Sequence, residues 1–188
     1  MKKVRAAVFA SGTGSNFQAI MEAGLHDDVA LLVCDKPGAA VIDLAQDFAV
    51  PTFVFDPKHY DSKADYESAV LEHLRGKNIT WVFLAGYMRI IGPTLLNAYP
   101  DKMINIHPSL LPDFPGKDAI GQAYEAGVST TGVTVHYIDD GVDTGPIITQ
   151  QKVSVFPDDT KEILTNRIQQ MEHKLYPQVI QQLMKSEQ

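Results

Sequence analysis

Short apolar runs alternate with amphipathic helical patterns through the first half of the chain, and this alternation limits the possible folds more than any other feature. The apolar runs are residues 4–10, 29–33, 52–55 and 79–85. The helical patterns between them are residues 15–23, 39–48 and 63–75. Apolar strands joined through helices form a mostly parallel sheet with helices on both faces. The pattern therefore predicts an α/β fold with a Rossmann-like sheet.

The second half of the chain has a different pattern, which begins with a short strand predicted at residues 103–106. A helix is predicted at 118–126, and two antiparallel strands, 133–138 and 147–155, flank a loop. A long amphipathic helix follows, with Asp159 as its expected cap. The residues expected on its buried face are Ile163, Ile168, Met171, Leu175, Val179 and Leu183. We expect the late strands to extend the parallel sheet, so that the 188 residues form one domain with lobes of about 1–100 and 101–188.

Composition limits the partners and the location of the protein. The chain has 16 Lys and Arg against 23 Asp and Glu, a net charge of −7, which gives no general attraction for nucleic acid or an anionic membrane. No apolar run reaches the roughly 18 residues of a membrane-spanning helix. A single cysteine, Cys34, excludes an internal disulfide framework and a multi-cysteine metal site. We expect a cytoplasmic protein that binds anionic substrates through local groups, such as helix N-termini and single cations.

The motif Ser11-Gly12-Thr13-Gly14-Ser15-Asn16 lies between the first predicted strand and the first helix. Its glycines permit a tight turn and a close approach of the backbone to a ligand, and N–H groups at the helix start face an anion. Phe17 replaces the third glycine of a dinucleotide fingerprint, although Asp35 follows about 20 residues later, as a ribose-binding acid would. The motif favours a single phosphate, and a plain turn with Ser15 as helix cap is the alternative.

The motif Asn105-Ile106-His107 ends a predicted strand, where open α/β sheets bind their ligands. Alternation along the strand places the amide and the imidazole on the same side of the sheet. An isolated Asn or His at a strand end is usually structural, but the stiff, proline-rich exit after this pair favours a function. Within that exit, the Leu111–Pro112 bond is a candidate for the cis form.

Two further segments lie close to ligand chemistry. The acidic loop, residues 139–146, contains Asp139, Asp140 and Asp143, and a carboxylate here would orient His107 and favour its charged form. A solvated turn is the alternative, because the spacing of a calcium loop is absent. The apolar segment 84–92 follows a buried strand and would line a slot for a flat aromatic ligand, or pack into the core.

Together these motifs resemble the phosphoribosylglycinamide (GAR) formyltransferases, which belong to the folate-dependent formyltransferases. The shared motifs are Ser-Gly-x-Gly-Ser-Asn, Ala-Gly-x-Met-Arg-Ile, Asn-Ile-His-Pro-Ser-Leu-Leu-Pro, Thr-x-His and Asp-x-Gly-Pro, in this order over nearly the whole chain. The resemblance implies that the formyl group of 10-formyltetrahydrofolate is transferred to the amino group of GAR in de novo purine biosynthesis. It implies direct attack through a tetrahedral intermediate, without a metal or a covalent enzyme intermediate.

The resemblance also implies roles for individual residues. The implied catalytic residues are Asn105, His107 and Asp143. The implied GAR-binding residues are Gly12, Thr13, Gly14, Ser15, Asn16 and, at the ribose, Glu172. The implied folate-binding residues are Lys63, Met88, Arg89, Ile90, Ile91, Asn105, Asp139 and Asp140. Lys63 stands where the family commonly has Arg, and residues 117–120 depart from a His-containing version of their loop. The resemblance therefore does not fix how Lys63 or this loop contacts the substrates.

The chemistry of the residues agrees with this resemblance. Attack of an amine on the formyl carbon creates an oxyanion, which the neutral amide of Asn105 would stabilise. His107 would move the proton from the amine to N10 of the folate. The alternatives are formyltetrahydrofolate deformylase, which normally has an extra N-terminal regulatory domain, methionyl-tRNA formyltransferase, which needs a basic C-terminal domain, and a non-catalytic nucleotide-binding module. We expect small-molecule substrates and a monomer or homodimer.

Overall fold

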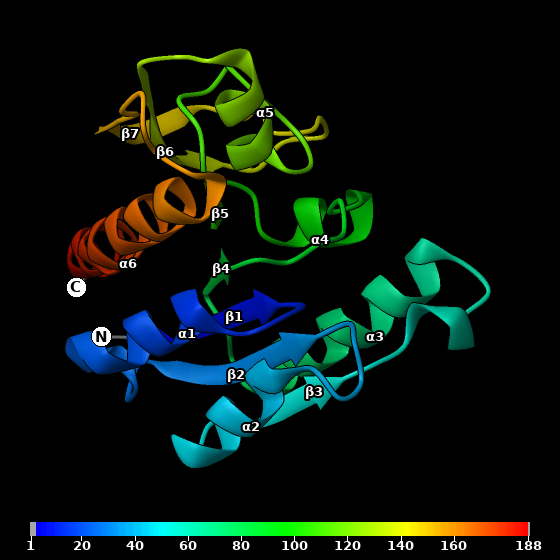
Figure 1. Cartoon of the computed structure of the whole chain (residues 1–188). Coiled ribbons are helices and arrows are strands. Elements are labelled where there is room, and N and C mark those ends of the chain that lie inside the picture. Colours follow the sequence, from blue (N-terminus) through cyan, green and yellow to red (C-terminus); the bar gives the residue numbers. More distant parts are fainter. Residues whose placement is uncertain (1–2, 188) are drawn as a thin grey trace.

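The computed structural model describes residues 3–187 and contains a seven-stranded sheet with the order β3-β2-β1-β4-β5-β6-β7 (Figure 1). The strands are β1 (Ala6–Ala10), β2 (Val29–Cys34), β3 (Thr52–Val54), β4 (Trp81–Leu84), β5 (Met103–His107), β6 (Thr130–Tyr137) and β7 (Ile147–Ser154). The first five strands are parallel, whereas β6 pairs antiparallel with β5 and β7 antiparallel with β6. The predicted α/β sheet and its extension by two late strands are confirmed.

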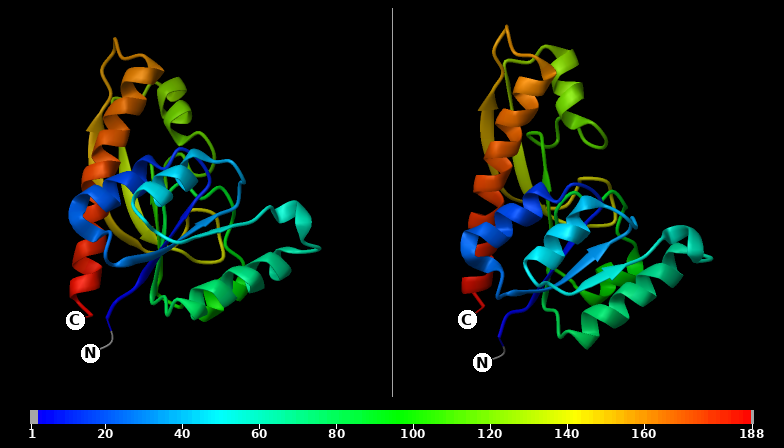
Figure 2. Two further views of the ribbon diagram at one scale, coloured as in Figure 1. Left: turned by 90° about the horizontal axis from the view of Figure 1, so that it is seen from below. Right: turned by 60° about the horizontal axis from the view of Figure 1, so that its bottom comes forward.

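Helices connect the strands and cover both faces of the sheet (Figure 2). They are α1 (Ser15–Ile20), which continues as a π-helical turn (Met21–Leu25), α2 (Ala40–Asp47), a 3-10 turn (Pro57–His59), α3 (Lys63–Gly76), α4 (Pro93–Ala98), α5 (Ala119–Ala126) and α6 (Lys161–Lys185). No helix in residues 3–187 is long and apolar enough to cross a membrane. Helix α4 was not predicted, although Pro93 at its first position is a typical start signal.

The start of α6 corrects the prediction by one residue. Thr160 caps the helix, because its side-chain oxygen accepts a hydrogen bond from the Ile163 N–H at 3.1 Å. Asp159 instead accepts two hydrogen bonds from the Arg167 guanidinium, at 2.5 and 2.9 Å. The buried face accordingly begins at Leu164, and Ile163 is 47% exposed.

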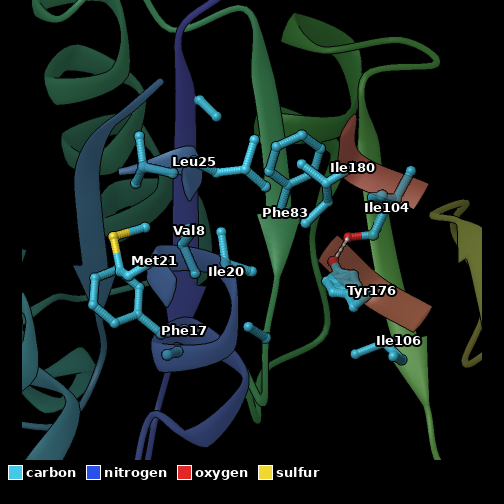
Figure 3. Packing of buried hydrophobic residues seen from close by; sticks show 14 of the residues in the cluster. Val8, Phe17, Ile20, Met21, Leu25, Phe83, Ile104, Ile106, Tyr176 and Ile180 are labelled. Carbon is cyan, nitrogen blue, oxygen red and sulfur yellow. Dashed lines mark hydrogen bonds between the residues drawn. The ribbon is translucent and has the colours of Figure 1, made fainter. Parts of the chain in front are cut away.

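Successive side chains along each strand pack into two separate hydrophobic cores, one on each face of the sheet. Val8 faces the layer of α1, α2 and α6, whereas Phe9, the next residue, faces α3 and α4. Figure 3 shows the first of these cores, where Phe17 and Ile20 of α1 pack beside Val8. Complete burial of one such side chain contributes roughly 1.5–3 kcal/mol, so these two layers fix the helices on the sheet.

Helix α6 is also fixed to the sheet by a buried hydrogen bond. The Tyr176 hydroxyl is fully buried and donates to the Leu84 carbonyl at 2.7 Å. The Ile104 carbonyl lies 3.4 Å from the same hydroxyl (Figure 3). Burial raises the pKa of Tyr176 well above its ordinary value, so the hydroxyl remains a donor. Because Leu84 ends β4 and Ile104 lies in β5, this bond holds α6 against the strands whose ends form the site described below.

The strand order reverses between β1 and β4, and this reversal determines where a ligand can bind. After β1 the chain enters α1 on one face of the sheet, and after β4 it enters α4 on the other face. The loops that follow two such strands diverge and leave a crevice at the carboxyl ends. This rule places the ligand crevice between residues 11–16 after β1 and residues 85–92 after β4, with the end of β5 next to them.

Candidate active site

The glycine motif forms the loop from β1 into α1. Gly14 adopts a left-handed conformation with φ 80° and precedes the helix, and the first helical hydrogen bond runs from Gln18 N–H to the Gly14 carbonyl at 2.8 Å. The N–H groups just before Gln18 therefore have no helical carbonyl to bind. A Cβ on Gly14 would approach Val41 Cγ2 to 2.7 Å, whereas a Cβ on Gly12 would have open space. Packing and backbone conformation therefore require glycine at position 14, whereas the protein itself leaves room for a side chain at position 12.

Glu172 of α6 is brought next to this loop. Helices α1 and α6 contact each other, and the Glu172 side chain interacts with the Asn16 side chain. Burial raises the pKa of Glu172 to about 7, although the hydrogen bond from Asn16 acts in the opposite direction. Asn16 Oδ1 is itself buried and has no hydrogen-bond partner among residues 3–187. The predicted phosphate-binding and ribose-binding residues therefore lie together.

On the other side of the crevice, residues 86–92 form what we call the crevice loop. The side chains of Met88 and Ile90 are 72% and 52% exposed, whereas Ile91 is buried in the core of α3 and α4. Lys63 donates from Nζ to the Ile90 carbonyl at 2.8 Å. The alternative of core packing thus applies to Ile91, and two apolar side chains of this loop are open to a ligand.

Asn105 and His107 lie on the same side of β5, as alternation predicts. Their neighbours Ile104 and Ile106 belong to the opposite core, which contains α6. In the antiparallel pair, Asn105 stands directly opposite His136 of β6, and Asn105 Nδ2 is 3.4 Å from His136 Nε2. Burial lowers the pKa of His136, which favours the neutral ring. The hydrogen bonds of that ring then determine whether the Asn105 amide donates to it or accepts from it.

A carbonyl can only accept, so His136 Nδ1, 2.8 Å from the Tyr137 carbonyl, carries the hydrogen. In the neutral ring Nε2 is then an acceptor, and Asn105 donates to it through Nδ2. This arrangement orients the amide group and leaves the second N–H of Asn105 for another acceptor. Sequence reasoning gave His136 no role, although the Thr-x-His motif contained it.

Asp143 lies between the two histidines. Its Oδ2 is 3.5 Å from His107 Nδ1 and its Oδ1 is 3.9 Å from His136 Nε2. The carboxylate also accepts a hydrogen bond from the Gly116 N–H at 2.8 Å. Asp143 has φ 55°, a left-handed conformation that Asp adopts more readily than most residues. Asp143 thus lies beside both histidines and Asn105 lies beside His136, so the three residues predicted to be catalytic gather at the end of β5.

The other nitrogen of His107 is occupied by the loop that follows β5. Nε2 of this buried ring is 2.9 Å from the Phe114 carbonyl, to which it can only donate. Nδ1, which faces Asp143, is then the nitrogen whose protonation can change. The Leu111–Pro112 bond in the same loop is cis, which confirms that prediction.

The remaining predicted carboxylates belong to the acidic loop. Asp139 accepts hydrogen bonds from the Gly141 N–H at 2.9 Å and the Thr144 hydroxyl at 2.6 Å. The Thr144 bond, followed by the Gly141 bond, holds the pKa of Asp139 below its usual value. Asp140 is exposed and free to meet a ligand, whereas Asp139 maintains the turn that presents Asp143.

Comparison with known proteins agrees with this geometry. Residues 4–180 match the family described as formyl transferase. The chain belongs to the formyl transferase family. It is 55% identical over 188 residues to a phosphoribosylglycinamide formyltransferase of Bacillus subtilis (strain 168), which covers 98% of this chain and 95% of that protein.

Solved structures of other formyl transferases share the fold. One is glycinamide ribonucleotide transformylase 1 from Geobacillus kaustophilus, with 60% identity, a TM-score of 0.94, and coverage of 97% of this chain and 100% of that chain. Another is phosphoribosylglycinamide formyltransferase from Bacillus halodurans, with 50% identity, a TM-score of 0.94, and coverage of 98% and 97%. The sheet, its antiparallel extension and the long C-terminal helix are therefore those of this family.

Proposed function

We propose that this formyl transferase moves the formyl group of 10-formyltetrahydrofolate to the amino group of GAR in purine synthesis. The observation that carries the proposal is the meeting of an amide, an imidazole and a carboxylate at the end of β5, in Asn105, His107 and Asp143. Similarity over nearly the full chain to proteins named for this activity supports the choice of substrates. The single cysteine favours a cytoplasmic location.

In the proposed reaction, the amine of GAR attacks the formyl carbon and the formyl oxygen becomes an oxyanion. The free N–H of Asn105 stabilises that oxyanion, because His136 already holds the other N–H and orients the amide. A neutral donor suits this place, since it adds no positive charge that would repel the amine nitrogen, which itself becomes positive during the attack. Asn105 therefore acts in the transition state more than in substrate binding.

His107 carries the proton in the same proposal. As the new C–N bond forms, the amine loses a proton, and N10 of the folate must gain one before its bond to the formyl carbon breaks. His107 Nδ1 takes up the first proton and supplies the second, while Nε2 stays fixed on the Phe114 carbonyl. Asp143 beside Nδ1 stabilises the charged imidazole and fixes its orientation.

The two substrates enter from the two sides of the crevice. The phosphate of GAR binds to the loop Gly12, Thr13, Gly14, Ser15 and Asn16, and Glu172 accepts a hydrogen bond from the ribose. The folate ring lies against Met88, Arg89 and Ile90 and against the backbone of Ile91, with Lys63, Asp139 and Asp140 at its border. Both substrates then meet at Asn105.

A turnover assay with 10-formyltetrahydrofolate, with and without GAR, tests this function. We expect formylated GAR and tetrahydrofolate to appear in equal amounts, and only when GAR is present. Release of formate at the same rate without GAR would identify a deformylase, in which water replaces the amine. Binding of the folate with no turnover under either condition would identify a non-catalytic module.

A further inference from the structure

Asp35 directly follows β2, at the position where a dinucleotide-binding protein has its ribose-binding acid. Its carboxylate, however, is turned into the protein. The side chain is only 5% exposed. One oxygen accepts a hydrogen bond from the Ser11 hydroxyl at 2.5 Å, and the other accepts one from Arg89 Nε at 2.9 Å. Both oxygens are therefore occupied, and Asp35 is not placed to hold a ribose.

The partners of Asp35 belong to the two loops that border the crevice. The Ser11 hydroxyl, which donates to Asp35, also accepts a hydrogen bond from the Met88 N–H at 2.9 Å. The Ser11 N–H donates to the Gly86 carbonyl at 3.1 Å. Asp35 thus holds Arg89 directly and Met88 through Ser11, so that two successive residues of the crevice loop are fixed by one buried carboxylate.

The crevice loop needs such support because little of it is packed where the ligand would bind. Met88 is 72% exposed, and the Arg89 side chain is 42% exposed. Holding an exposed segment in one conformation costs conformational entropy. A charge-assisted hydrogen bond to a buried carboxylate is among the stronger contacts that can offset this cost. Among the hydrogen bonds that Met88 and Arg89 form within residues 3–187, the only carboxylate partner is Asp35, which bonds Arg89.

We infer that Asp35 is a positioning residue for the folate: it fixes Met88 and Arg89 in the conformation that receives the folate ring and touches neither substrate. The inference rests on the proposed function for the identity of the ligand. Its consequence is specific, because the support is directed at the folate side of the crevice. Loss of the carboxylate weakens folate binding and leaves GAR binding nearly unchanged.

The Asp35→Asn variant tests this directly. Asparagine has the same shape, but its amide nitrogen cannot accept, so the charge and one of the two contacts are lost. We expect the KM for 10-formyltetrahydrofolate to rise about tenfold, with kcat and the KM for GAR within about twofold of wild type. The control is Asp47→Asn, an exposed position of α2 with the same change in net charge, for which both KM values stay at wild type.

Two further variants keep the inference falsifiable if Asp35→Asn folds poorly. Ser11→Ala removes the link to Met88 with little change in volume and should raise the folate KM in the same direction. In an Arg89→Ala background, Asp35→Asn should add less to the folate KM than it does alone, because the two residues act through one contact. An unchanged folate KM, or equal rises for both substrates, would overturn the inference.

Direct binding separates this inference from the proposed function. The dissociation constant of 10-formyltetrahydrofolate is measured by calorimetry for wild type and Asp35→Asn, without GAR. A wild type that binds the folate but does not formylate GAR contradicts the proposed function, and the inference is then decided by the change in folate affinity alone. A wild type that does not bind the folate contradicts both.

Discussion

At the scale of a single residue, Glu172 shows how the fold sets the charge of a group that we propose binds the ribose of GAR. Burial raises its pKa from the ordinary 4.5 to about 7. Between these two values the folded chain binds a proton that the unfolded chain has lost. Stability therefore decreases as the pH rises through this window. Below this window, the carboxyl is neutral in both the folded and the unfolded chain, so its protonation does not change the free energy of unfolding.

The Glu172→Gln variant should remove this pH dependence, because glutamine keeps the shape and cannot titrate. We expect it to be more stable than wild type at pH 8 by up to about 3 kcal/mol, and close to wild type at pH 4.5. Urea unfolding at the two pH values measures the difference. A difference between variant and wild type that does not change with pH would show that Glu172 is not shifted by burial.

At the scale of an element, the turn from β1 into α1 contains one glycine that packing requires, Gly14, and one, Gly12, that we propose faces the phosphate. Gly14 has φ 80° and would press a Cβ against Val41, so Gly14→Ala should destabilise the protein by about 1–3 kcal/mol. Gly12 has open space, so Gly12→Ala should change stability by less than about 0.5 kcal/mol. Urea unfolding of the two variants measures both effects.

The same pair tests the phosphate site. If the loop holds the phosphate closely, Gly12→Ala places a methyl group where the ligand approaches and should weaken GAR binding at least about tenfold, about 1.4 kcal/mol. Folate binding serves as the internal control and should stay near wild type. Wild-type affinity for GAR in Gly12→Ala would mean that the phosphate binds elsewhere.

Helix α6 gives a second prediction at this scale. Tyr176→Phe removes the hydroxyl that donates to the Leu84 carbonyl and leaves that buried carbonyl without this donor. We expect a loss of about 1–3 kcal/mol in the free energy of unfolding, measured by urea denaturation. Tyr124→Phe is the matched control, because Tyr124 of α5 is 39% exposed, and it should be neutral. Equal effects of the two substitutions would contradict the role of the hydrogen bond.

At the scale of the whole molecule, local sequence patterns predicted the strands of the sheet better than the short helices and the exact ends of helices. The strands of the parallel half followed from their apolar runs, because burial on both faces leaves that mark in the sequence. Helix α4 has six residues, too few for a periodic pattern. The cap of α6 was misplaced because Asp159 and Thr160 are both capping residues, and the ion pair of Asp159 with Arg167 decides between them.

The candidate site shows the same limit. Asn105 and His107 could be paired from strand alternation alone, since that property is local. Asp143 was placed with them through the resemblance, because no local pattern joins β5 to the loop after β6. His136 was missed for the same reason: its contact with Asn105 depends on the register between β5 and β6. Asp35 was noticed for its spacing, but its partners depend on three separate strand ends.

The central claim is that Asn105, His107 and Asp143 form one catalytic group, and single-turnover formyl transfer with saturating GAR and folate tests it most directly. The variants are Asn105→Ala and Asp143→Asn, since Asn also tolerates the left-handed backbone of residue 143. Exposed residues supply the matched controls, Asn166→Ala and Asp158→Asn.

We predict that the transfer rate falls about 100-fold or more in both site variants, while the controls stay at wild type. The loss should appear in the rate constant with little change in the affinity for either substrate, because the contacts are made in the transition state. Rates near wild type for both Asn105→Ala and Asp143→Asn would show that these residues are structural and would contradict the mechanism.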